Sequence, residues 1–278
     1  MAIFLSLLTA AIFGAGDFTG GIAAKRTRVI EVVAGSHFVG LVGVTVVALF
    51  TAEEFTGRDF ALGAAGGACG GIGVALLYRR LAEGPMAVVA PLTAITSAIV
   101  PATWGVFSGE RLGALGWIGV VVALVAIGAI SMSNDQAGAP VTPAVIIESL
   151  GAGVGFGAFF ILIDATDSAT SPWPIVGARV LTASLLTLWI LRRPKQITTR
   201  SKSVVGLIAL AGLLDTSSNV LFLLATNIGD LTVVSVLSSF YPASTVLLAW
   251  MILGEKMTRL QGAGFALAIG ASVLIALG

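Results

Sequence analysis

The sequence predicts an all-α polytopic membrane protein whose ten transmembrane helices form two inverted five-helix repeats. Three observations predict this fold class: an apolar composition, ten apolar stretches of membrane-spanning length, and a weak internal repeat. Of the 278 residues, 57% are hydrophobic and only 10% are charged, and the mean hydropathy is +1.03. Soluble globular domains contain about 25% charged residues. The composition therefore excludes soluble enzymes, secreted disulfide-rich proteins and disordered chains, and it indicates that lipid is the solvent.

Ten apolar stretches have close to the roughly 20 residues that a helix needs to cross a bilayer. They cover residues 2–22, 30–50, 60–79, 84–107, 114–133, 143–163, 173–191, 204–226, 230–253 and 258–277. The first stretch lacks a basic leading segment and is too long for the apolar part of a signal peptide, so we expect it to remain as a helix. The connections are nearly all short, and the longest covers residues 192–203. Any function must therefore reside inside the helix bundle.

The two halves of the chain repeat each other weakly. A shift of 145 positions aligns GVFSGERLGALGWIG (105–119) with WMILGEKMTRLQGAG (250–264), and it also aligns Gly84 with Gly229. Glu110 and Glu255 coincide in this alignment, each followed by a basic residue at a helix boundary. We expect each of these carboxylates to cap the helix that follows it.

We assign residues 1–137 to the first repeat and residues 138–278 to the second, with five helices in each. Because five is an odd number, the second repeat enters the bilayer upside down relative to the first. Inverted repeats of this kind are typical of secondary transporters.

Five ionisable side chains lie within the predicted membrane helices: Asp17, His37, Glu148, Arg179 and Asp215. A charge at the bilayer centre costs roughly 2.5–3.5 kcal/mol on insertion scales, so each needs a partner or a polar cavity. Asp215 shares one helical turn with Ser218 and Asn219, a grouping that suits an ammonium ion or a proton. Two interpretations remain open for Asp215: a role in transport, or an ion pair with Arg179 or His37 that holds helices together.

Glu148 and His37 also allow two interpretations each. Glu148 follows the proline at the start of the sixth helix, where either a substrate contact or an interfacial position fits. His37 can titrate near neutral pH and so joins Asp17 and Asp215 as a proton-coupling candidate. A single histidine on an apolar helix also fits a packing role.

Prolines and hydroxyl groups mark two candidate walls of a substrate path. Pro242 lies within SSFYPAST (238–245), near Ser238 and Tyr241. A proline inside a helix leaves one carbonyl without its donor and bends the chain. Thr93 and Trp104, in the proline-containing fourth helix, are the candidates for the opposite wall. The serine and threonine side chains equally fit hydrogen bonds to their own helix carbonyls.

Small residues recur four apart, as in Gly63, Gly67 and Gly71 or Gly151 and Gly155. This spacing is typical of close helix packing in membranes and also of contacts that slide.

The sequence offers no constellation for catalysis or for a metal. It contains one His and one Cys, Cys69, and no HExxH or GxSxG motif. Its net charge of +1 and the absence of a basic cluster exclude nucleic acid as a partner. We therefore expect no enzyme activity, and the expected partners are the lipid bilayer and a small-molecule substrate. A monomer and a homodimer fit equally.

The basic residues are distributed unequally between the two ends of the predicted bundle. One end carries twelve of them: Lys25, Arg26, Arg28, Arg79, Arg80, Arg192, Arg193, Lys195, Arg200, Lys202, Lys256 and Arg259. The other end carries Arg58 and Arg111. Since basic loops face the cytoplasm, this count places both termini outside it.

Two segments resemble the EamA-type transporters of the drug/metabolite transporter (DMT) superfamily: LSSFYPASTVLLAWMILGEKMTRLQGAGFALAIGASVLIAL (237–277) and GARVLTASLLTL (177–188), which contains Arg179. The ten-helix pattern extends the resemblance over essentially the whole chain. In the first half His37 stands where the family often has arginine, and the prolines of the fourth and ninth helices do not align.

The resemblance implies a multi-pass carrier of the cell (inner) membrane, commonly an exporter of amino acids or other small metabolites, with no ATPase and no bound cofactor. It implies a cavity lined by helices 1, 3, 4, 6, 8 and 9, and the family usually has both termini in the cytoplasm. We therefore expect a secondary active transporter that exports small polar metabolites by alternating access. The alternative is a multidrug or lipid-type exporter, which would need a more aromatic cavity than two tyrosines supply.

Overall fold

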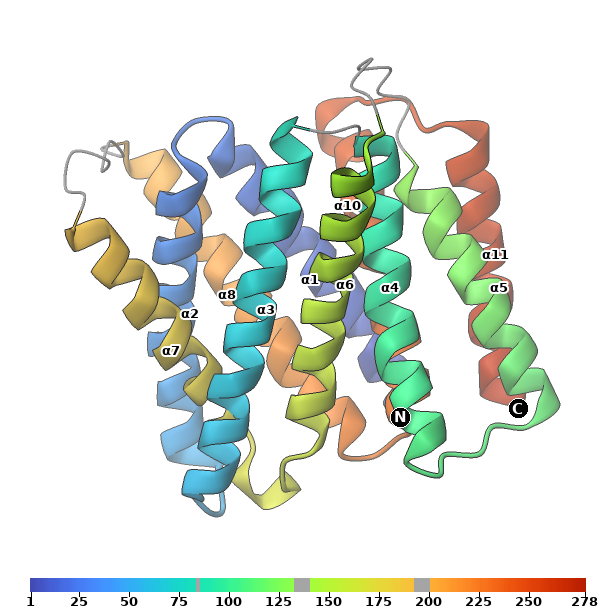
Figure 1. Ribbon diagram of the computed structural model, residues 1–278, viewed down its shortest axis with the longest axis horizontal. Coiled ribbons are helices and arrows are strands. Elements are labelled where there is room, and N and C mark those ends of the chain that lie inside the picture. Colours follow the sequence, from blue (N-terminus) through green and yellow to red (C-terminus); the bar gives the residue numbers. More distant parts are fainter. Residues whose placement is uncertain (84–85, 133–140, 193–200) are drawn as a thin grey trace.

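The computed structural model describes residues 1–83, 86–132, 141–192 and 201–278, and in these residues it contains helices and no strand (Figure 1). The helices are α1 (Ala2–Ala24), α2 (Val29–Thr51), α3 (Gly57–Glu83), α4 (Met86–Phe107), α5 (Ala114–Ser131), α6 (Pro143–Asp164), η1 (Ser168–Thr170), α7 (Trp173–Leu191), α8 (Lys202–Thr226), α9 (Leu231–Ser238), α10 (Tyr241–Leu248), η3 (Ala249–Leu253) and α11 (Arg259–Leu277).

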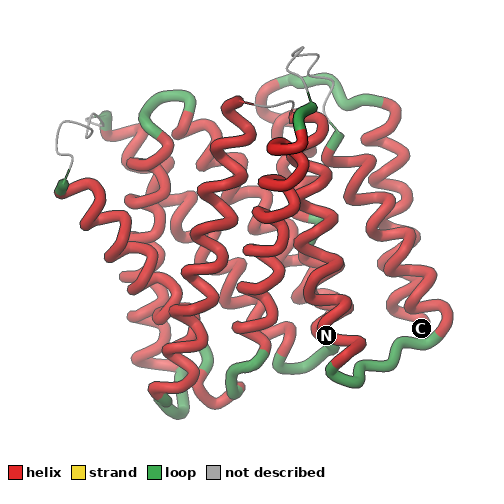
Figure 2. The backbone as a smooth tube through the Cα atoms, in the orientation of Figure 1, coloured by secondary structure: helices red, strands yellow, loops and turns green. Residues whose placement is uncertain are grey.

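Within the described residues, ten helical segments are long and apolar enough to cross a membrane, which confirms the predicted spans. The ninth span consists of α9, α10 and the π-helical η3. The connections lie at the two ends of the bundle, and both termini lie at the same end (Figures 1 and 2). The predicted boundary between the repeats, at residues 137 and 138, lies outside the described residues.

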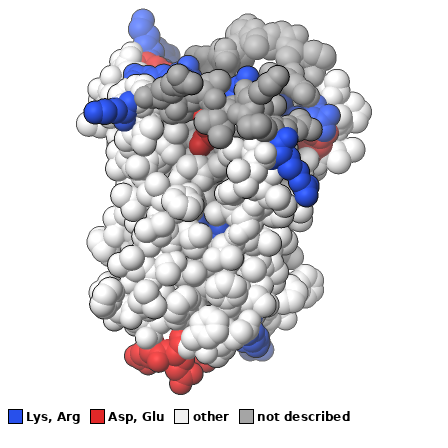
Figure 3. Space-filling model, turned by 90° about the vertical axis from the view of Figure 1, so that its left-hand side faces the viewer, with Lys and Arg blue, Asp and Glu red and all other residues white. Residues whose placement is uncertain are grey.

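Acidic residues predominate at one end of the bundle and basic residues at the other (Figure 3). We call the end with both termini the acidic end; its described ionisable residues are Glu53, Glu54, Arg58, Asp59, Glu110, Arg111, Asp164, Asp167 and Asp230. We call the other the basic end; its described Lys and Arg residues are Lys25, Arg26, Arg28, Arg79, Arg80, Arg192, Lys202, Lys256 and Arg259. A wide, mostly uncharged surface formed by the ten apolar spans separates the two ends, as expected of a protein that spans a bilayer.

The helices pair in a pattern with two-fold regularity. Helix α1 packs against α8 and α6 packs against α3, and α2 contacts α8 as α7 contacts α3. Helix α4 contacts α6 as α9 and α10 contact α1. The pairs α5 with α11, α2 with α7 and α4 with α9 each join equivalent helices of the two halves. This is the pattern that inverted repeats produce about a pseudo-two-fold axis.

Glycines allow several of these helices to touch backbone to backbone. A Cβ atom at Gly67 of α3 would lie 2.6 Å from the carbonyl oxygen of Ala178 in α7. A Cβ atom at Gly155 of α6 would lie 2.7 Å from the carbonyl oxygen of Cys69 in α3. The packing role predicted for these glycines is confirmed, because a larger side chain at either position would force the helices apart.

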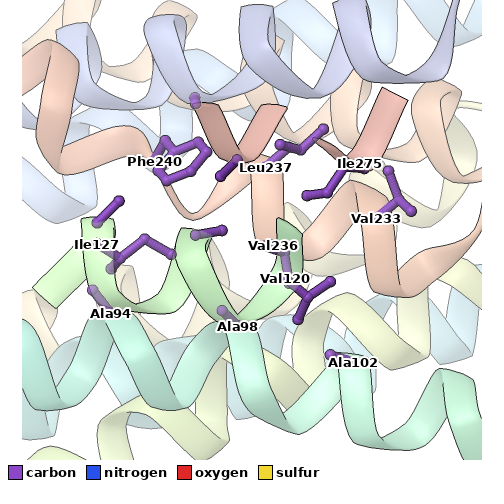
Figure 4. Packing of buried hydrophobic residues seen from close by; sticks show 14 residues of the cluster. Ala94, Ala98, Ala102, Val120, Ile127, Val233, Val236, Leu237, Phe240 and Ile275 are labelled. Atoms are coloured by element: carbon purple, nitrogen blue, oxygen red, sulfur yellow. The ribbon is translucent and has the colours of Figure 1, made fainter. Parts of the chain in front are cut away.

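The largest buried apolar cluster among the described residues joins five helices, α1, α4, α5, α9 and α11 (Figure 4). Ala94, Ala98 and Ala102 form one face of α4 and pack against α5 and α9. Since lipid tails are as apolar as these side chains, close contact and dispersion hold the cluster together more than exclusion from water does.

The ninth span is interrupted in the middle. Helix α9 ends at Ser238 and α10 begins at Tyr241, so the bend expected near Pro242 is a complete break. Pro242 has no amide to donate to the Ser238 carbonyl, and it is accommodated in the first turn of α10. Beyond the break, the hydroxyl groups of Ser244 and Thr245 donate to the carbonyls of Ala10 (2.9 Å) and Gly14 (3.1 Å) in α1. These bonds fix α10 against α1.

Glu110 connects the two halves at the acidic end. Its carboxylate accepts hydrogen bonds from the amides of Leu231 (2.6 Å) and Thr232 (3.0 Å), the first residues of α9. The expectation that it caps the following helix is wrong, because α5 follows Gly113 with no side-chain cap. The negative charge satisfies amides that would otherwise lack partners at a helix start. Loss of solvent and the nearby Glu110 carboxylate raise the pKa of Asp230.

The same expectation for Glu255 is also wrong. Helix α11 is capped by Thr258 and Gln261, whose side chains and backbone amides bond reciprocally. The side chain of Glu255 is exposed. The Gly-Glu-basic pattern thus recurs in the sequence, but the two glutamates differ in the structure. Glu110 caps the start of α9, and Glu255 caps neither α11 nor another described helix.

A second carboxylate also joins the halves at the acidic end. Asp59, at the start of α3, accepts hydrogen bonds from the amide of Asp167 (3.0 Å) and the hydroxyl of Thr170 (2.9 Å). Both donors lie in the connection between α6 and α7. Together with Glu110, this contact closes the acidic end of the bundle.

Replacing Glu110 by Gln should lower thermal stability, because the amide removes the charge and leaves one acceptor oxygen for two backbone donors. Loss of such a cap costs about 1 kcal/mol, which corresponds to a decrease in Tm of roughly 2–4 °C for a chain of this size. Glu255→Gln is the matched control and should leave Tm unchanged. Thermal unfolding of both purified variants in detergent tests this, and equal Tm values for the two would contradict the proposed cap.

Candidate substrate site

Three of the predicted site residues meet in the middle of the bundle. The guanidinium group of Arg179 (α7) forms an ion pair with Asp215 (α8) through Nη2. Its Nη1 lies 3.3 Å from Nε2 of His37 (α2). Arg179 is only 7% exposed. The ion pair that the sequence left as one of two interpretations is therefore present. It joins two helices of the second half, and the contact with His37 adds α2 of the first half.

Hydrogen bonding determines which nitrogen of His37 carries the proton. His37 Nδ1 lies 2.8 Å from the hydroxyl oxygen of Thr182, and that hydroxyl donates to the Ala178 carbonyl (2.9 Å). Because the hydroxyl proton is used, the oxygen accepts from Nδ1–H and leaves the lone pair on Nε2 facing Arg179. Neutral His37 thus accepts a hydrogen bond from the Arg179 guanidinium through Nε2 and donates one to Thr182 through Nδ1.

Asp17 brings a second carboxylate to this cluster. It lies two thirds of the way along α1, and the neighbouring Gly16 approaches α8 so closely that a Cβ atom there would lie 3.3 Å from the Asp215 amide nitrogen. The carboxyl group of Asp17 lies within electrostatic range of Asp215 and of the Tyr241 hydroxyl. It is exposed, and it forms no hydrogen bond or ion pair with the described residues.

The break between α9 and α10 places an aromatic wall beside Asp17. Tyr241 is the first residue of α10, and its ring meets that of Phe13 (α1) edge to face, with centroids 6.5 Å apart. The phenol supplies a polar group next to an apolar surface. Both rings come from elements that pack together through the Ser244 and Thr245 hydrogen bonds.

The cluster has one cation and two carboxylates, and part of it is open. The Asp215 side chain is 36% exposed, and the buried Nε of Arg179 has no hydrogen-bond partner among the described residues. Such a site can bind an ammonium group at Asp17, exchange a proton at either carboxylate, or offer Arg179 to an incoming anion that competes with Asp215.

The remaining predicted residues lie elsewhere or have other partners. Glu148 accepts two hydrogen bonds from Arg80, at 2.7 and 2.8 Å, and lies 3.5 Å from Arg79. This group joins α3 to α6 near the basic end. Trp104 is 51% exposed and is not among the contacts of the cluster. Thr93 is buried and donates to the Ser149 carbonyl (3.2 Å), so it links α4 to α6.

Polar side chains near Asp215 bond to its backbone and do not extend its carboxylate site. The Asn219 amide and the Ser218 hydroxyl donate to the Asp215 carbonyl, at 2.7 and 2.6 Å. The hydroxyl of Ser238 is buried at the end of α9 without a hydrogen-bond partner in the described structure. Of the predicted set, the structure thus brings together Asp17, His37, Arg179, Asp215 and Tyr241. Thr182 was missed, although its place three residues after Arg179 puts both on one helix face.

Comparisons with known proteins agree with this architecture. Residues 144–277 match the model of the EamA-like transporter family, and no curated protein matches the chain. A solved structure described only as "Crystal structure of protein" is similar with a TM-score of 0.77 and 16% identity, over 99% of this chain and 96% of that chain. That similarity shows that the fold as a whole is shared. The second half of this chain, α6 to α11, is thus similar to the EamA-like transporter family, which is consistent with an EamA-type transporter of the DMT superfamily.

Proposed function

We propose that this protein is a secondary active carrier that moves small polar metabolites, such as amino acids, across the cytoplasmic (inner) membrane by alternating access. The observation that carries the proposal is the unpaired carboxylate of Asp17 beside the Arg179–Asp215 ion pair, in the middle of ten apolar spans. A carboxylate at this depth is costly unless water or a polar ligand reaches it.

The arrangement of charges favours a substrate that carries both signs. Asp17 is available to an ammonium group. The planar guanidinium of Arg179 can donate hydrogen bonds to a substrate carboxylate, which would compete with Asp215 for it. Tyr241 and Phe13 offer an apolar wall to the rest of the substrate. An α-amino acid has this combination of groups, which supports that substrate class.

The architecture favours movement of one half against the other. Inverted repeats with a broken helix at the substrate site are the design by which many carriers expose one site to two sides in turn. The contacts of Glu110 and Asp59 that join the halves at the acidic end would have to open in each cycle. Export is the direction that the family resemblance favours.

Asp17→Asn and Asp215→Asn should each reduce transport in proteoliposomes by at least about tenfold, because each removes a charge that binds substrate or carries a proton. The substrate group is first chosen by a growth-tolerance screen of overexpressing cells against amino acids, sugars and cationic drugs. Transport is then measured with and without an imposed pH gradient. Glu53→Gln, an exposed change of equal charge at the acidic end, is the control.

Full transport with unchanged pH dependence in both aspartate variants would overturn the roles of these carboxylates. Tolerance restricted to cationic drugs would favour the multidrug alternative.

His37→Gln should retain transport within about threefold, because a glutamine side chain can still accept from Arg179 and donate to Thr182. His37→Ala removes both bonds and should lose most activity. Rates measured between pH 5.5 and 8 distinguish positioning from proton transfer. If His37→Gln abolished the pH dependence while leaving the rate at one pH intact, His37 would be a proton carrier and not a positioning residue.

The charge asymmetry supports placing the basic end in the cytoplasm and both termini outside it. A fusion of alkaline phosphatase to the carboxyl terminus should therefore be active in cells, and a fusion of green fluorescent protein at the same point should not fluoresce. The reverse pair of results would place the termini in the cytoplasm.

A further inference from the structure

We propose that a groove on the lipid-facing side, between α2, α7 and α8, binds an anionic glycerophospholipid with its phosphate at the basic end. The proposal is independent of the transported substrate. It rests on an apolar groove, three cations at the rim of that groove, and two helix starts that lack side-chain caps.

The groove consists of two adjoining hollows. One, of about 310 Å³, is lined by apolar side chains that include Phe38, Ile190, Val205 and Ile208. The other, of about 350 Å³, continues along α2 and α7 past Leu41 and Leu188. Phe38 lines both hollows and is 58% exposed. From Glu31 to Leu41 the groove follows α2 for ten residues, or about 15 Å, a length that suits an acyl chain.

Three separate helix ends each bring a cation to the upper rim of this groove. Arg28 directly precedes α2, three residues before Glu31; Arg192 directly follows α7, two residues after Ile190; and Lys202 begins α8, three residues before Val205. All three cations are exposed. Figure 3, which faces the side of the bundle that carries α2 and α7, shows Lys and Arg gathered at one end of a mostly uncharged surface.

The helix starts at the rim add further positive potential. Arg28 before α2 and Ser201 before α8 supply no side-chain acceptor to the first amides of the two helices. Such amides and the helix dipole favour a phosphate. The one carboxylate that lines the hollow, Glu31, is 8% exposed and accepts a hydrogen bond from Thr27 (2.7 Å). The exposed charge of the rim is therefore positive.

Charge and shape together select the occupant. A phosphodiester with a net negative charge matches the cations and the positive ends of the two helices, and its acyl chain matches the apolar groove below them. A zwitterionic lipid lacks the net charge, and free glycerol phosphate lacks the chain. Because α2 belongs to the first half and α7 and α8 to the second, a bound lipid would contact both halves.

Native mass spectrometry of the detergent-solubilised protein tests the proposal with phosphatidylglycerol and phosphatidylcholine as probes. We expect the wild type to retain phosphatidylglycerol about tenfold better than phosphatidylcholine. Arg28→Gln/Lys202→Gln should weaken phosphatidylglycerol retention by about fivefold for each cation removed. Lys256→Gln/Arg259→Gln, an equal charge change beside α11 on the same end, should leave retention unchanged.

A second variant tests the groove itself. Val205→Trp places a large side chain at an exposed position in the hollow, and it should reduce phosphatidylglycerol retention while leaving Tm unchanged. Equal loss in the two double variants, no preference between the lipids, or displacement of phosphatidylglycerol by free glycerol phosphate would each overturn the proposal.

Discussion

The structure depends on one ion pair in the middle of the membrane, between Arg179 and Asp215. An unpaired charge is costly at this depth, so the pair stabilises α7 against α8, and the bond to His37 adds α2. Thr182 orients the imidazole so that its lone pair faces the guanidinium. Asp17 is the carboxylate of this cluster that has no ion-pair partner among the described residues. A bundle that needed the pair only for stability would have no use for a second carboxylate beside it.

The packing of small residues brings the backbone close enough for this network. Gly16 lets α1 lie directly against the α8 backbone at Asp215, and Gly67 does the same between α3 and α7. The break before Pro242 then places Tyr241 next to Asp17, and hydrogen bonds from α10 to α1 keep it there. Close backbone contact, a broken helix and buried charge therefore occur at one level of the bundle, where a carrier with inverted repeats binds its substrate.

The positions of the helices could be predicted from the sequence, because they depend on local residue patterns. The ion-pair and hydrogen-bond partners on other helices could not be predicted. Hydropathy located all ten spans because the length of an apolar run sets where a helix can cross lipid. The choice of Asp215 as the partner of Arg179 stayed open because it depends on how helices rotate against one another. Glu110 was predicted to cap its own neighbour, yet it bonds to amides 121 residues away, at Leu231. Asn219 bonds to its own helix because the Asp215 carbonyl lies one turn earlier.

The exchange Arg179→Asp/Asp215→Arg tests the central claim most directly, because it restores an ion pair between α7 and α8 while reversing the charge presented at each position. Thermal unfolding establishes that the exchanged protein is folded, and transport is measured in proteoliposomes at equal protein. The account predicts a folded protein that transports at less than about one tenth of the wild-type rate, because the cation has moved from α7 to α8 and its position relative to the substrate is lost. Transport at the wild-type rate would show that the pair only holds the helices together.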